Sequence, residues 1–585
     1  MRPSIGRSPR AVKTLRDAGL YVPFRLLRGG LPAAERSRFA ELRAFRRAYG
    51  GLLRETSAAA ARPRGRVLFP HLSPGLFRTR VDGMLAKALA LRGLEPVFVT
   101  NREELWHEEH LRVFGFREFL FVEDYLGSAV ESDRLAGELL EGASSQDDVL
   151  AIRHGHAEVG RHAGSRVLKD LRRGSLDLGD PVLRGALHRS MGRSIAHAVA
   201  ADRILDEVSP ALLVTSEKGY SPWAEFYDDA LRRGIDTVHW YRSHLEHSLL
   251  FRRFSWDDRH EHFFTLSDET WRELRRGPWL PEQGEEFVRR LRESYVHGTW
   301  FERKKTLQGK RMKSPDELRA DLGLDPAKRT AFVFSHVLYD ATFWFGDNLF
   351  PDYAVWLVET IRAACANPHV NWVIKMHPEN VLKARNQTGS YELGQLEEYR
   401  LIAASFPTLP QHVRLMLPED DTNTASLFDF ADYALTVRGT VGLEFPCFGV
   451  PTFTAGTGGY SGRGFTLDSK TPAEYLERLG RIEETPPLDG PTTDLARRFS
   501  HGVFQLKPVP IETFTWTRIP EKEGDPLGPY DFRLTVGSAE ELRRAPDLGL
   551  FADWAADSKA RDLMAPTDGA IVRELESLED VFETT

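Results

Sequence analysis

The chain has 585 residues, of which 41% are hydrophobic and 28% are charged, so it exceeds one ordinary domain and predicts two large ones with extensions. Its formal net charge of −7 argues against a general attraction to nucleic acid, and no apolar run is long enough to cross a membrane. With no secretory signal at Met1 and only two cysteines, Cys365 and Cys447, a disulfide framework is excluded and a cytoplasmic location is expected.

Residues 1–60 are rich in arginine and poor in acidic residues, with apolar side chains between Tyr21 and Leu27. Such a basic segment can lie on an anionic membrane surface, where each cation contributes about 1 kcal/mol. The alternative is a solvated helical extension that packs on the first domain. We therefore expect either a peripheral attachment to the inner face of the membrane or a helical addition to the fold.

Residues 61–265 predict a first Rossmann-like domain, because short apolar runs alternate with helical spacing. A strand, a helix and a second strand in succession imply a right-handed crossover in a parallel sheet. The expected strands lie at 66–71, 96–100, 210–215 and 236–240, and the expected helices at 80–92, over most of 104–206 and at 222–233.

Residues 266–326 are charged and helical in pattern and predict a bridge, in which Ser314, Pro315 and Glu317 mark a helix start. Residues 327–490 resume the alternation and predict a second Rossmann-like domain. Residues 491–585 predict a Pro-rich, acidic, helical tail. In the second domain, strands are expected at 330–334, 370–376, 413–417, 433–437 and 450–454, and helices at 353–366, 424–430 and after Arg438.

A strand that ends in a His-Pro step is the most informative motif. The apolar run VNWVIKM is typical of a parallel strand buried on both faces, and Pro378 ends it. Alternation places Lys375 and His377 on one side of the strand at the carboxyl edge of the sheet, where ligands of open α/β sheets bind. A histidine there can donate to a phosphate as the leaving nucleotide gains charge. The alternative is a solvated His377 and a Lys375 that pairs with Glu379.

A second motif follows the apolar run YALTV. Arg438, Gly439 and Thr440 fall at a strand-to-helix turn, where free N–H groups and the helix dipole favour an anion. Gly439 allows close approach of a phosphate, and Arg438 can donate to two of its oxygens. Glu444 lies one turn after Thr440 on the same helix face, where a carboxylate can accept from both ribose hydroxyls. The alternative is a surface glutamate near a capping threonine.

At these motifs the chain resembles the capsule polysaccharide biosynthesis glycosyltransferases, which include enzymes that transfer Kdo or sialic acid from CMP-sugars on a GT-B fold. The matching segments, within residues 327–475, are FSHVLYDATFWFGDNLF, NWVIKMHPENV and TVRGTVGLEFPCFGVPTFTAGTGGYSGRGF. The resemblance implies that His377, Pro378, Thr440 and Glu444 hold the nucleotide of a sugar donor without a metal or other cofactor. The turn at Arg438 departs from the serine pair of some relatives, which leaves the base and sugar open.

The first strand of the second domain leads into Ser335 and His336, which we expect to contact the donor phosphates or the sugar. An aromatic loop follows, with Asp340 and Asp347 near its ends. For Phe343 and Phe345 core packing is the favoured interpretation.

The acceptor should bind to the first domain, where a base must take the proton of the acceptor hydroxyl. Glu217, which precedes Lys218, is the best carboxylate candidate, although a loop ion pair is the alternative. His71 is the second catalytic candidate. Its region includes Gly75, Arg78, Arg80 and Asp82, of which Gly75 and the two arginines could also clamp an anionic acceptor such as a phospholipid-linked sugar.

Three histidines, His239, His244 and His247, invite a metal interpretation. Their spacing fits no common zinc signature and no cysteine is near, so no metal is expected.

Together these features predict a GT-B glycosyltransferase that moves a sugar from a nucleotide-sugar, with a CMP-sugar slightly favoured, to a polysaccharide or lipid-linked acceptor. A UDP-sugar 2-epimerase is the nearest alternative, because related patterns occur there. A non-catalytic, sugar-nucleotide-binding component of a capsule assembly complex is the alternative of another class.

Overall fold

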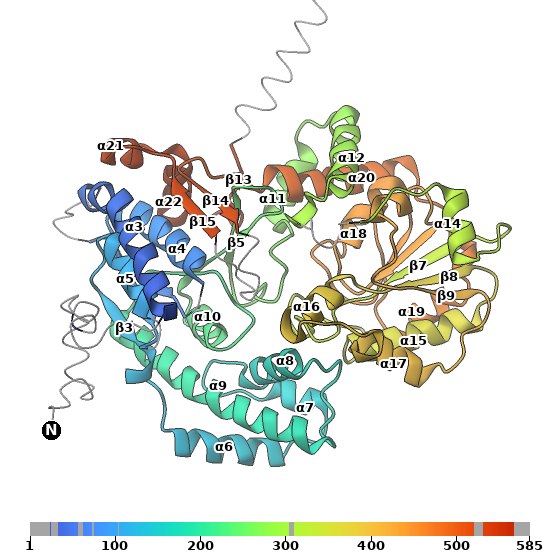
Figure 1. Cartoon of the computed structure of the whole chain (residues 1–585), viewed down its shortest axis with the longest axis horizontal. Coiled ribbons are helices and arrows are strands. Elements are labelled where there is room, and N and C mark those ends of the chain that lie inside the picture. The colour runs from blue at the N-terminus through green and yellow to red at the C-terminus, as the bar shows by residue number, and fades with distance from the viewer. Residues whose placement is uncertain are drawn as a thin grey trace, which may run out of the picture.

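The computed structural model describes residues 33–56, 63–72, 75–102, 105–302, 309–519 and 530–566, together with Phe24. Two α/β domains lie side by side, each built around a mainly or wholly parallel sheet (Figure 1). The structure thus confirms the predicted fold class of two Rossmann-like domains.

The first sheet has seven strands in the order β13-β6-β5-β4-β1-β2-β3. Its central strands are continuous apolar runs buried on both faces, and Leu68, Val99 and Leu213 are fully buried. The sequence analysis missed β6, which runs antiparallel to β5. The strands are β1 (Gly65–Pro70), β2 (Leu94–Thr100), β3 (Phe119–Phe121), β4 (Leu212–Thr215), β5 (Asp236–Arg242), β6 (Ser248–Phe254) and β13 (Val509–Pro510).

Helices cover the first sheet, and the group from α6 to α9 reaches from the first domain towards the second (Figure 1). The longest of them, α9, begins where the side chain of Asp180 accepts from the amides of Val182 and Leu183, with Pro181 in the first turn. The helices are α4 (Leu76–Leu91), α5 (Leu105–Val113), α6 (Ala129–Glu141), α7 (Gln146–Ala151), α8 (Val159–Leu171), α9 (Pro181–Val208) and α10 (Trp223–Arg232).

The described part of the basic extension is a helix, α3 (Ala33–Glu55), that packs on the first domain. Its Leu42, Phe45 and Leu53 are buried in the core of that domain. For this helix, the alternative of a helical extension packed on the first domain is therefore confirmed. The remainder of residues 1–32, apart from Phe24, lies outside the described residues. Across the described ranges no helix is both long and apolar enough to cross a bilayer.

The second sheet has six parallel strands in the order β12-β11-β10-β7-β8-β9. The chain leaves the central β7 first towards β8 and later returns on the other side as β10, so the strand order reverses at β7. The strands are β7 (Thr330–Phe334), β8 (Asn371–Lys375), β9 (Val413–Met416), β10 (Tyr433–Thr436), β11 (Thr452–Thr454) and β12 (Leu467–Asp468). The helices are α15 (Tyr353–Ala366), α16 (Glu379–Thr388), α17 (Glu397–Ser405), α18 (Val441–Glu444) and α19 (Pro472–Leu479).

The bridge is helical as predicted, with α11 (Asp268–Arg276), α12 (Pro281–Val296) and α14 (Pro315–Leu322). The Ser314 hydroxyl and the Glu317 carboxylate cap α14 reciprocally, as the sequence indicated. The helix predicted over 424–430 is a short 3-10 turn over Thr424–Leu427.

The prediction of a purely helical tail is wrong. After α20 (Gly490–His501) the chain returns to the first domain and adds β13, a hairpin of β14 (Phe514–Arg518) and β15 (Tyr530–Leu534), and the helices α21 (Ala539–Arg543) and α22 (Pro546–Asp557) (Figure 1). The apolar side chains of the hairpin alternate and complete the core of the first domain. This two-residue period was present in the sequence, but the strands are short and lie among prolines and acidic residues.

The returning segment is held by the ammonium of Lys507, which is fully buried. It donates to the carbonyls of Phe263 (3.1 Å) and Thr265 (2.6 Å) and to Asp562 Oδ1 (2.7 Å). Three acceptors thus satisfy the three donors of the ammonium group. Burial lowers the pKa of Lys507 to about 8, against the opposing charge of Asp562.

Replacing Lys507 by methionine should lower the free energy of unfolding of the first domain by about 3–5 kcal/mol, because Asp562 stays buried without the ammonium group that bonds to it. Urea unfolding followed by tryptophan fluorescence measures the change. The control Lys470→Met alters an exposed lysine and should shift the value by less than about 0.5 kcal/mol. A loss below about 1 kcal/mol for Lys507→Met would show that the buried pair does not stabilise the return.

Candidate active site

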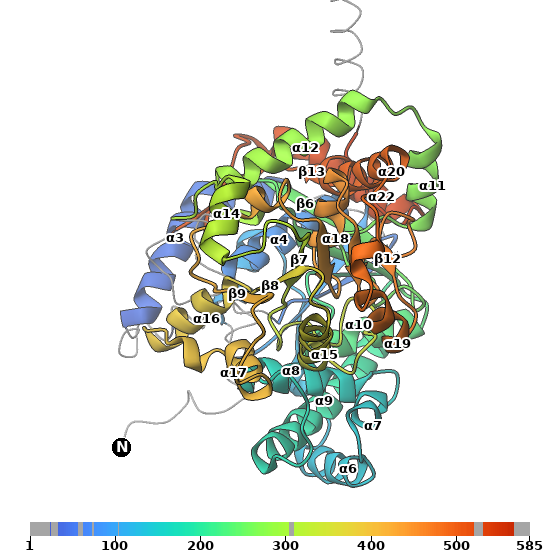
Figure 2. The ribbon, with the colours of Figure 1, turned by 90° about the vertical axis from the view of Figure 1, so that its right-hand side faces the viewer.

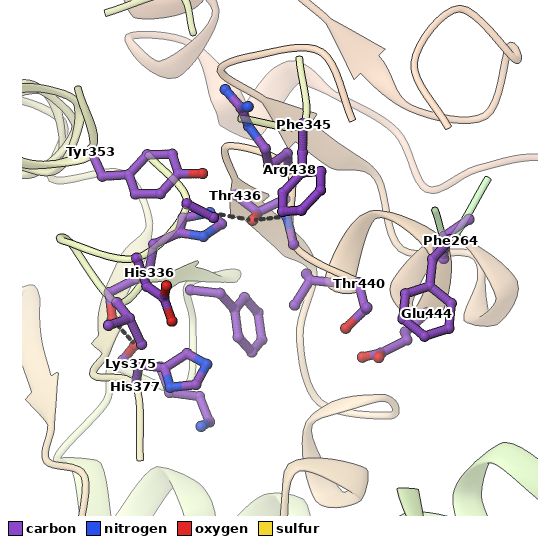
Figure 3. Close-up of a pocket in the computed structure, with 18 of the residues that line it drawn as sticks. Phe264, His336, Phe345, Tyr353, Lys375, His377, Thr436, Arg438, Thr440 and Glu444 are labelled. Carbon is purple, nitrogen blue, oxygen red and sulfur yellow. Dashed lines mark hydrogen bonds between the residues drawn. The ribbon is translucent and has the colours of Figure 1, made fainter. Parts of the chain in front are cut away.

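A cavity of about 330 Å³ lies at the carboxyl edge of the second sheet, around the strand-order reversal at β7. Open α/β sheets bind ligands at this position. The structure brings together at this cavity every residue predicted to bind the nucleotide-sugar (Figure 3). These are Ser335 and His336 after β7, Lys375, His377 and Pro378 after β8, and Arg438, Gly439, Thr440 and Glu444 after β10.

His377 has a defined tautomer when it is neutral. Its Nδ1 accepts from the backbone amide of Glu379 at 3.2 Å, so the ring proton is on Nε2. Pro378 begins the first turn of α16, and the side chains of His377 and Lys375 are both half-buried (Figure 3). The His-Pro step therefore offers an N–H donor and an ammonium group at the edge of the sheet.

His336 is neutral and fixed in orientation. Burial, and then the charge of Arg438, lower the pKa of His336 to about 3. Its Nε2 accepts from the amide of Val437 at 3.1 Å, and its ring stacks on Tyr353 with centroids 4.5 Å apart. The proton is consequently on Nδ1, so His336 can contribute a donor to the cavity but no charge.

The guanidinium of Arg438 is bound by the protein itself and is not placed to donate to two phosphate oxygens as predicted. Its Nη1 donates to the carbonyls of Trp344 (2.5 Å) and Gly346 (3.0 Å), and its Nη2 bonds to Asn348 Oδ1. The guanidinium points away from Thr440 in Figure 3. The terminal donors of Arg438 hold the loop 344–348, and only the rest of the residue lines the cavity.

The turn after β10 depends on close packing around Gly442. A Cβ there would lie 2.0 Å from the ring of Tyr460, whose hydroxyl donates to the carbonyl of Gly439 at 2.9 Å. The amides of Leu443 and Glu444 bond back to the carbonyl of Thr440. The first amides of such a turn have no partner within the helix, so those of Thr440 and Val441 are the donors suited to an anion.

Glu444 is 1% exposed and is oriented by the bridge. The Tyr295 hydroxyl donates to its Oε2 at 2.9 Å, and the indole of Trp300 donates to its Oε1 at 3.0 Å. Each carboxylate oxygen keeps a further lone pair, which can accept from a ribose hydroxyl. The sequence pointed to Glu444 but gave no sign of these two partners, because they come from a separate element.

The chain crossing between the domains adds His262 and Phe264 to the cavity, which the sequence analysis also missed. Burial, followed by the charge of Lys218, lowers the pKa of His262 to about 3, so it carries no charge at neutral pH. Phe345 packs against His262 with ring centroids 4.5 Å apart. Phe345 thus lines the cavity, while Phe343 is buried among first-domain helices, as the core interpretation proposed.

Asp340 joins the two domains at the cavity. Its Oδ1 accepts from the Tyr220 hydroxyl at 2.9 Å and lies 3.2 Å from Lys169 Nζ, both from the first domain, and its Oδ2 accepts from Lys383 at 2.7 Å. Burial opposes ionisation, but Lys383 and Lys169 outweigh it and lower the pKa of Asp340. Asp347 is exposed, and its carbonyl accepts from the amide of Thr457 at 2.8 Å.

Glu217 is half-buried and caps its own loop, since its Oε1 accepts from the amides of Lys218 (2.9 Å) and Gly219 (3.0 Å). Lys218 turns away from it and donates to the carbonyls of Arg259 and Glu261. The expected loop ion pair is therefore not formed. Glu217 does not itself line the cavity, although Lys218 Nζ lies 5.6 Å from the ring centre of Phe345, which does.

His71 does not face the cavity. It is buried in the first domain, where Nδ1 bonds to Asp82 at 2.7 Å and Nε2 lies 2.9 Å from the Thr79 hydroxyl. Arg80, expected near an anionic acceptor, instead donates to Glu41 of α3 at 2.8 Å. These partners make His71, Asp82 and Arg80 parts of the buried structure of the first domain.

His239, His244 and His247, for which the sequence predicted no metal, each have a different contact. His239 stacks on Tyr241, His244 packs against Trp300, and His247 Nδ1 accepts from the amide of Trp516. Within the described ranges, no group of three or more His, Cys, Asp or Glu side chains is arranged to hold a metal ion.

No family model and no curated protein matches the chain. Similar solved structures include a β-Kdo 2,4-transferase, KpsC of Thermosulfurimonas dismutans, with 15% identity over 57% of this chain and 86% of that chain at a TM-score of 0.29. Another is the UDP-GlcNAc 2-epimerase from Neisseria meningitidis bound to UDP-GlcNAc, with 9% identity over 75% of this chain and 95% of that chain at a TM-score of 0.23. A third is the spinosyn rhamnosyltransferase SpnG, with 11% identity over 75% of this chain and 96% of that chain at a TM-score of 0.24. Similarity at this level does not assign a reaction to the chain.

Removing the hydroxyl of Tyr295 should weaken nucleotide binding by about tenfold, because hydrogen bonds to charged groups contribute about 1.5–3 kcal/mol. Isothermal titration of Tyr295→Phe and wild type with whichever of CMP, UDP, GDP and CDP binds the wild type most tightly measures this. Tyr475→Phe is a matched control, since it removes a buried hydroxyl that bonds to Trp356 and Thr360, outside the cavity lining. Equal affinities for both variants and wild type would remove Glu444 from the site.

Proposed function

We propose that the chain is a glycosyltransferase that moves a sugar from a nucleotide-activated donor to a surface polysaccharide or lipid-linked acceptor. The observation that carries the proposal is the single cavity shared by the His377 ring, the Thr440 turn and the Glu444 carboxylate. Phosphates require N–H donors and cations, and a ribose requires an acceptor for its hydroxyl protons. A CMP-sugar is favoured only by the resemblance of the motifs.

In this proposal His377 and Lys375 stabilise the charge that develops on the phosphate of the leaving nucleotide. The donor function of His377 follows from its tautomer, with the proton on Nε2. Glu217 is the proposed base for the acceptor hydroxyl, since it follows β4 at the carboxyl edge of the first sheet and its Oε1 is held by the amides of Lys218 and Gly219. No metal is invoked at any step.

The first test is a thermal-shift comparison of CMP, UDP, GDP and CDP, because a ligand that binds the native state raises the unfolding temperature. The corresponding sugar nucleotides are then incubated with glycan acceptors, and the products are identified by mass spectrometry. Transfer of the sugar supports the proposal. A product sugar that stays on the nucleotide identifies a 2-epimerase, and binding without any reaction identifies a non-catalytic component. The absence of any nucleotide shift would overturn the site itself.

Replacing His377 by alanine should reduce turnover by about 10²–10³-fold, the effect of losing one preorganised donor to developing charge. The donor KM should change little, since the donation strengthens as the phosphate gains charge. Steady-state kinetics on the donor provides both values. His369→Ala alters an exposed histidine of the same domain and should leave turnover unchanged. Turnover of His377→Ala within a few-fold of wild type would make His377 structural.

We also propose that residues 1–32 attach the enzyme to an anionic membrane, a role that their arginine content supports. Because α3 is packed on the first domain, the deletion should stop before Ala33. The full chain should co-sediment with anionic vesicles at low salt and dissociate as salt rises, and the deletion variant should stay in solution. Equal sedimentation of both proteins would refute the attachment.

A further inference from the structure

Glu398 of α17 is a carboxyl group buried directly behind the strand-end loops of the donor cavity, and it is 1% exposed. The side-chain amide of Asn380, in the first turn of α16, donates to its Oε2 at 2.8 Å. Its Oε1 is buried without a hydrogen-bond partner, and the Ser335 hydroxyl and the backbone amide of His377 lie near enough to stabilise its charge. One carboxyl group therefore contacts the ends of β7 and β8 and the start of α16.

These contacts connect two loops that the cavity requires in a fixed position. The Ser335 amide and hydroxyl both bond to the carbonyl of Lys375, at 3.2 and 3.1 Å. Ser335, Lys375 and His377 all line the donor cavity, whereas Glu398 does not. A displacement of the carboxyl group would thus move the donors that face a phosphate.

The ionisation state of Glu398 sets the charge beside the loops of Ser335 and His377. Burial raises the pKa of Glu398 to about 7, although the Ser335 hydroxyl, Asn380, the His377 amide and Lys375 oppose the rise. Glu398 also lines a separate polar cavity of about 240 Å³, through which a proton would reach it. Figure 2 shows α17 of the second domain beside α8 of the first, where the amide of Gly174 donates to Glu397. The charged or titratable groups around Glu398 are Lys375 and His377 after β8, Arg172 and Arg173 at the end of α8, Tyr339 after β7, and Glu397 and Arg400 on α17.

We propose that Glu398 is a positioning residue of the donor site, which ties the loops of Ser335 and His377 to α17 and takes up a proton when an anionic phosphate binds in front of them. The inference rests on the proposed nucleotide site and goes beyond it, because it identifies a proton coupled to donor binding. A buried negative charge behind the loops opposes a phosphate in front of them, and protonation from solvent removes it.

The direction of the pH effect follows from this linkage. At pH 6 most of the Glu398 carboxyl is already neutral in the free protein, so binding needs no further proton. At pH 8 the carboxyl is ionised and must be protonated as the nucleotide binds, which reduces affinity. The wild-type Kd for CMP, or for the nucleotide that the thermal-shift comparison selects, should therefore rise from pH 6 to pH 8.

The decisive comparison is between wild type and Glu398→Gln, which keeps the shape and one acceptor oxygen but cannot titrate. Between pH 6 and pH 8 the wild-type Kd should increase by about three- to tenfold more than the Kd of the variant. His377, Lys375, the arginines and the phosphate of the nucleotide are common to both proteins, so their effects cancel. Glu392→Gln, an exposed glutamate before α17, is the matched control and should behave as wild type.

The positioning part is tested by Glu398→Ala, which should weaken binding at least tenfold at every pH, while Glu398→Gln retains most of the affinity at pH 6. Parallel pH slopes for wild type and Glu398→Gln would overturn the coupled proton. Wild-type affinity in Glu398→Ala would overturn the positioning role. If no nucleotide binds to any of the proteins, the donor site itself is wrong and this inference is lost with it.

Discussion

The cavity at the carboxyl edge of the second sheet depends on the buried ammonium group of Lys507, which fixes the crossing between the two domains. A buried charge is costly unless all its hydrogen bonds are made, and Lys507 makes three, two of them to the carbonyls of Phe263 and Thr265. The side chains of His262 and Phe264, which line the cavity, lie on the same stretch of backbone. The C-terminal segment therefore shapes a cavity that it does not line, and the wrong prediction of a helical tail concealed this link.

Positive charge is scarcer in the cavity than its sequence suggests. His262 and His336 are neutral, since the pKa of each is about 3, and Arg438 is bound to the loop 344–348. In the proposed function, recognition of a phosphate then falls to Lys375, to His377 and to the first amides after β10. With so few charges, the proposed change in the protonation of Glu398 would have a large effect on phosphate binding, because no excess of cations masks it.

The strand-end residues could be predicted because strand boundaries and alternation are local properties of the sequence. His377, Thr440 and Glu444 follow from the position of Pro378 and from one helical turn. The function of Arg438 could not be predicted, since its direction depends on a loop 90 residues away in the chain. The positions of Tyr295 and Phe264 at the cavity could not be predicted for the same reason. They reach the cavity through tertiary packing, and a lone aromatic residue in a helical bridge or a crossing carries no local signal.

The loop held by Arg438 also explains why the first domain matters to a cavity it hardly lines. Trp344 is fully buried and stacks on His162 of the first domain at 5.2 Å, and a Cβ at Gly219 would be in tight contact with its ring at 3.0 Å. Ala341 and Phe345 have left-handed backbone, with φ of 56° and 70°, a conformation that costs about 1–3 kcal/mol per residue and persists only where packing over-determines it. The guanidinium on one side and the buried indole on the other supply that packing. Because Phe345 lines the cavity of the second sheet, the shape of this cavity requires the first domain to be in place.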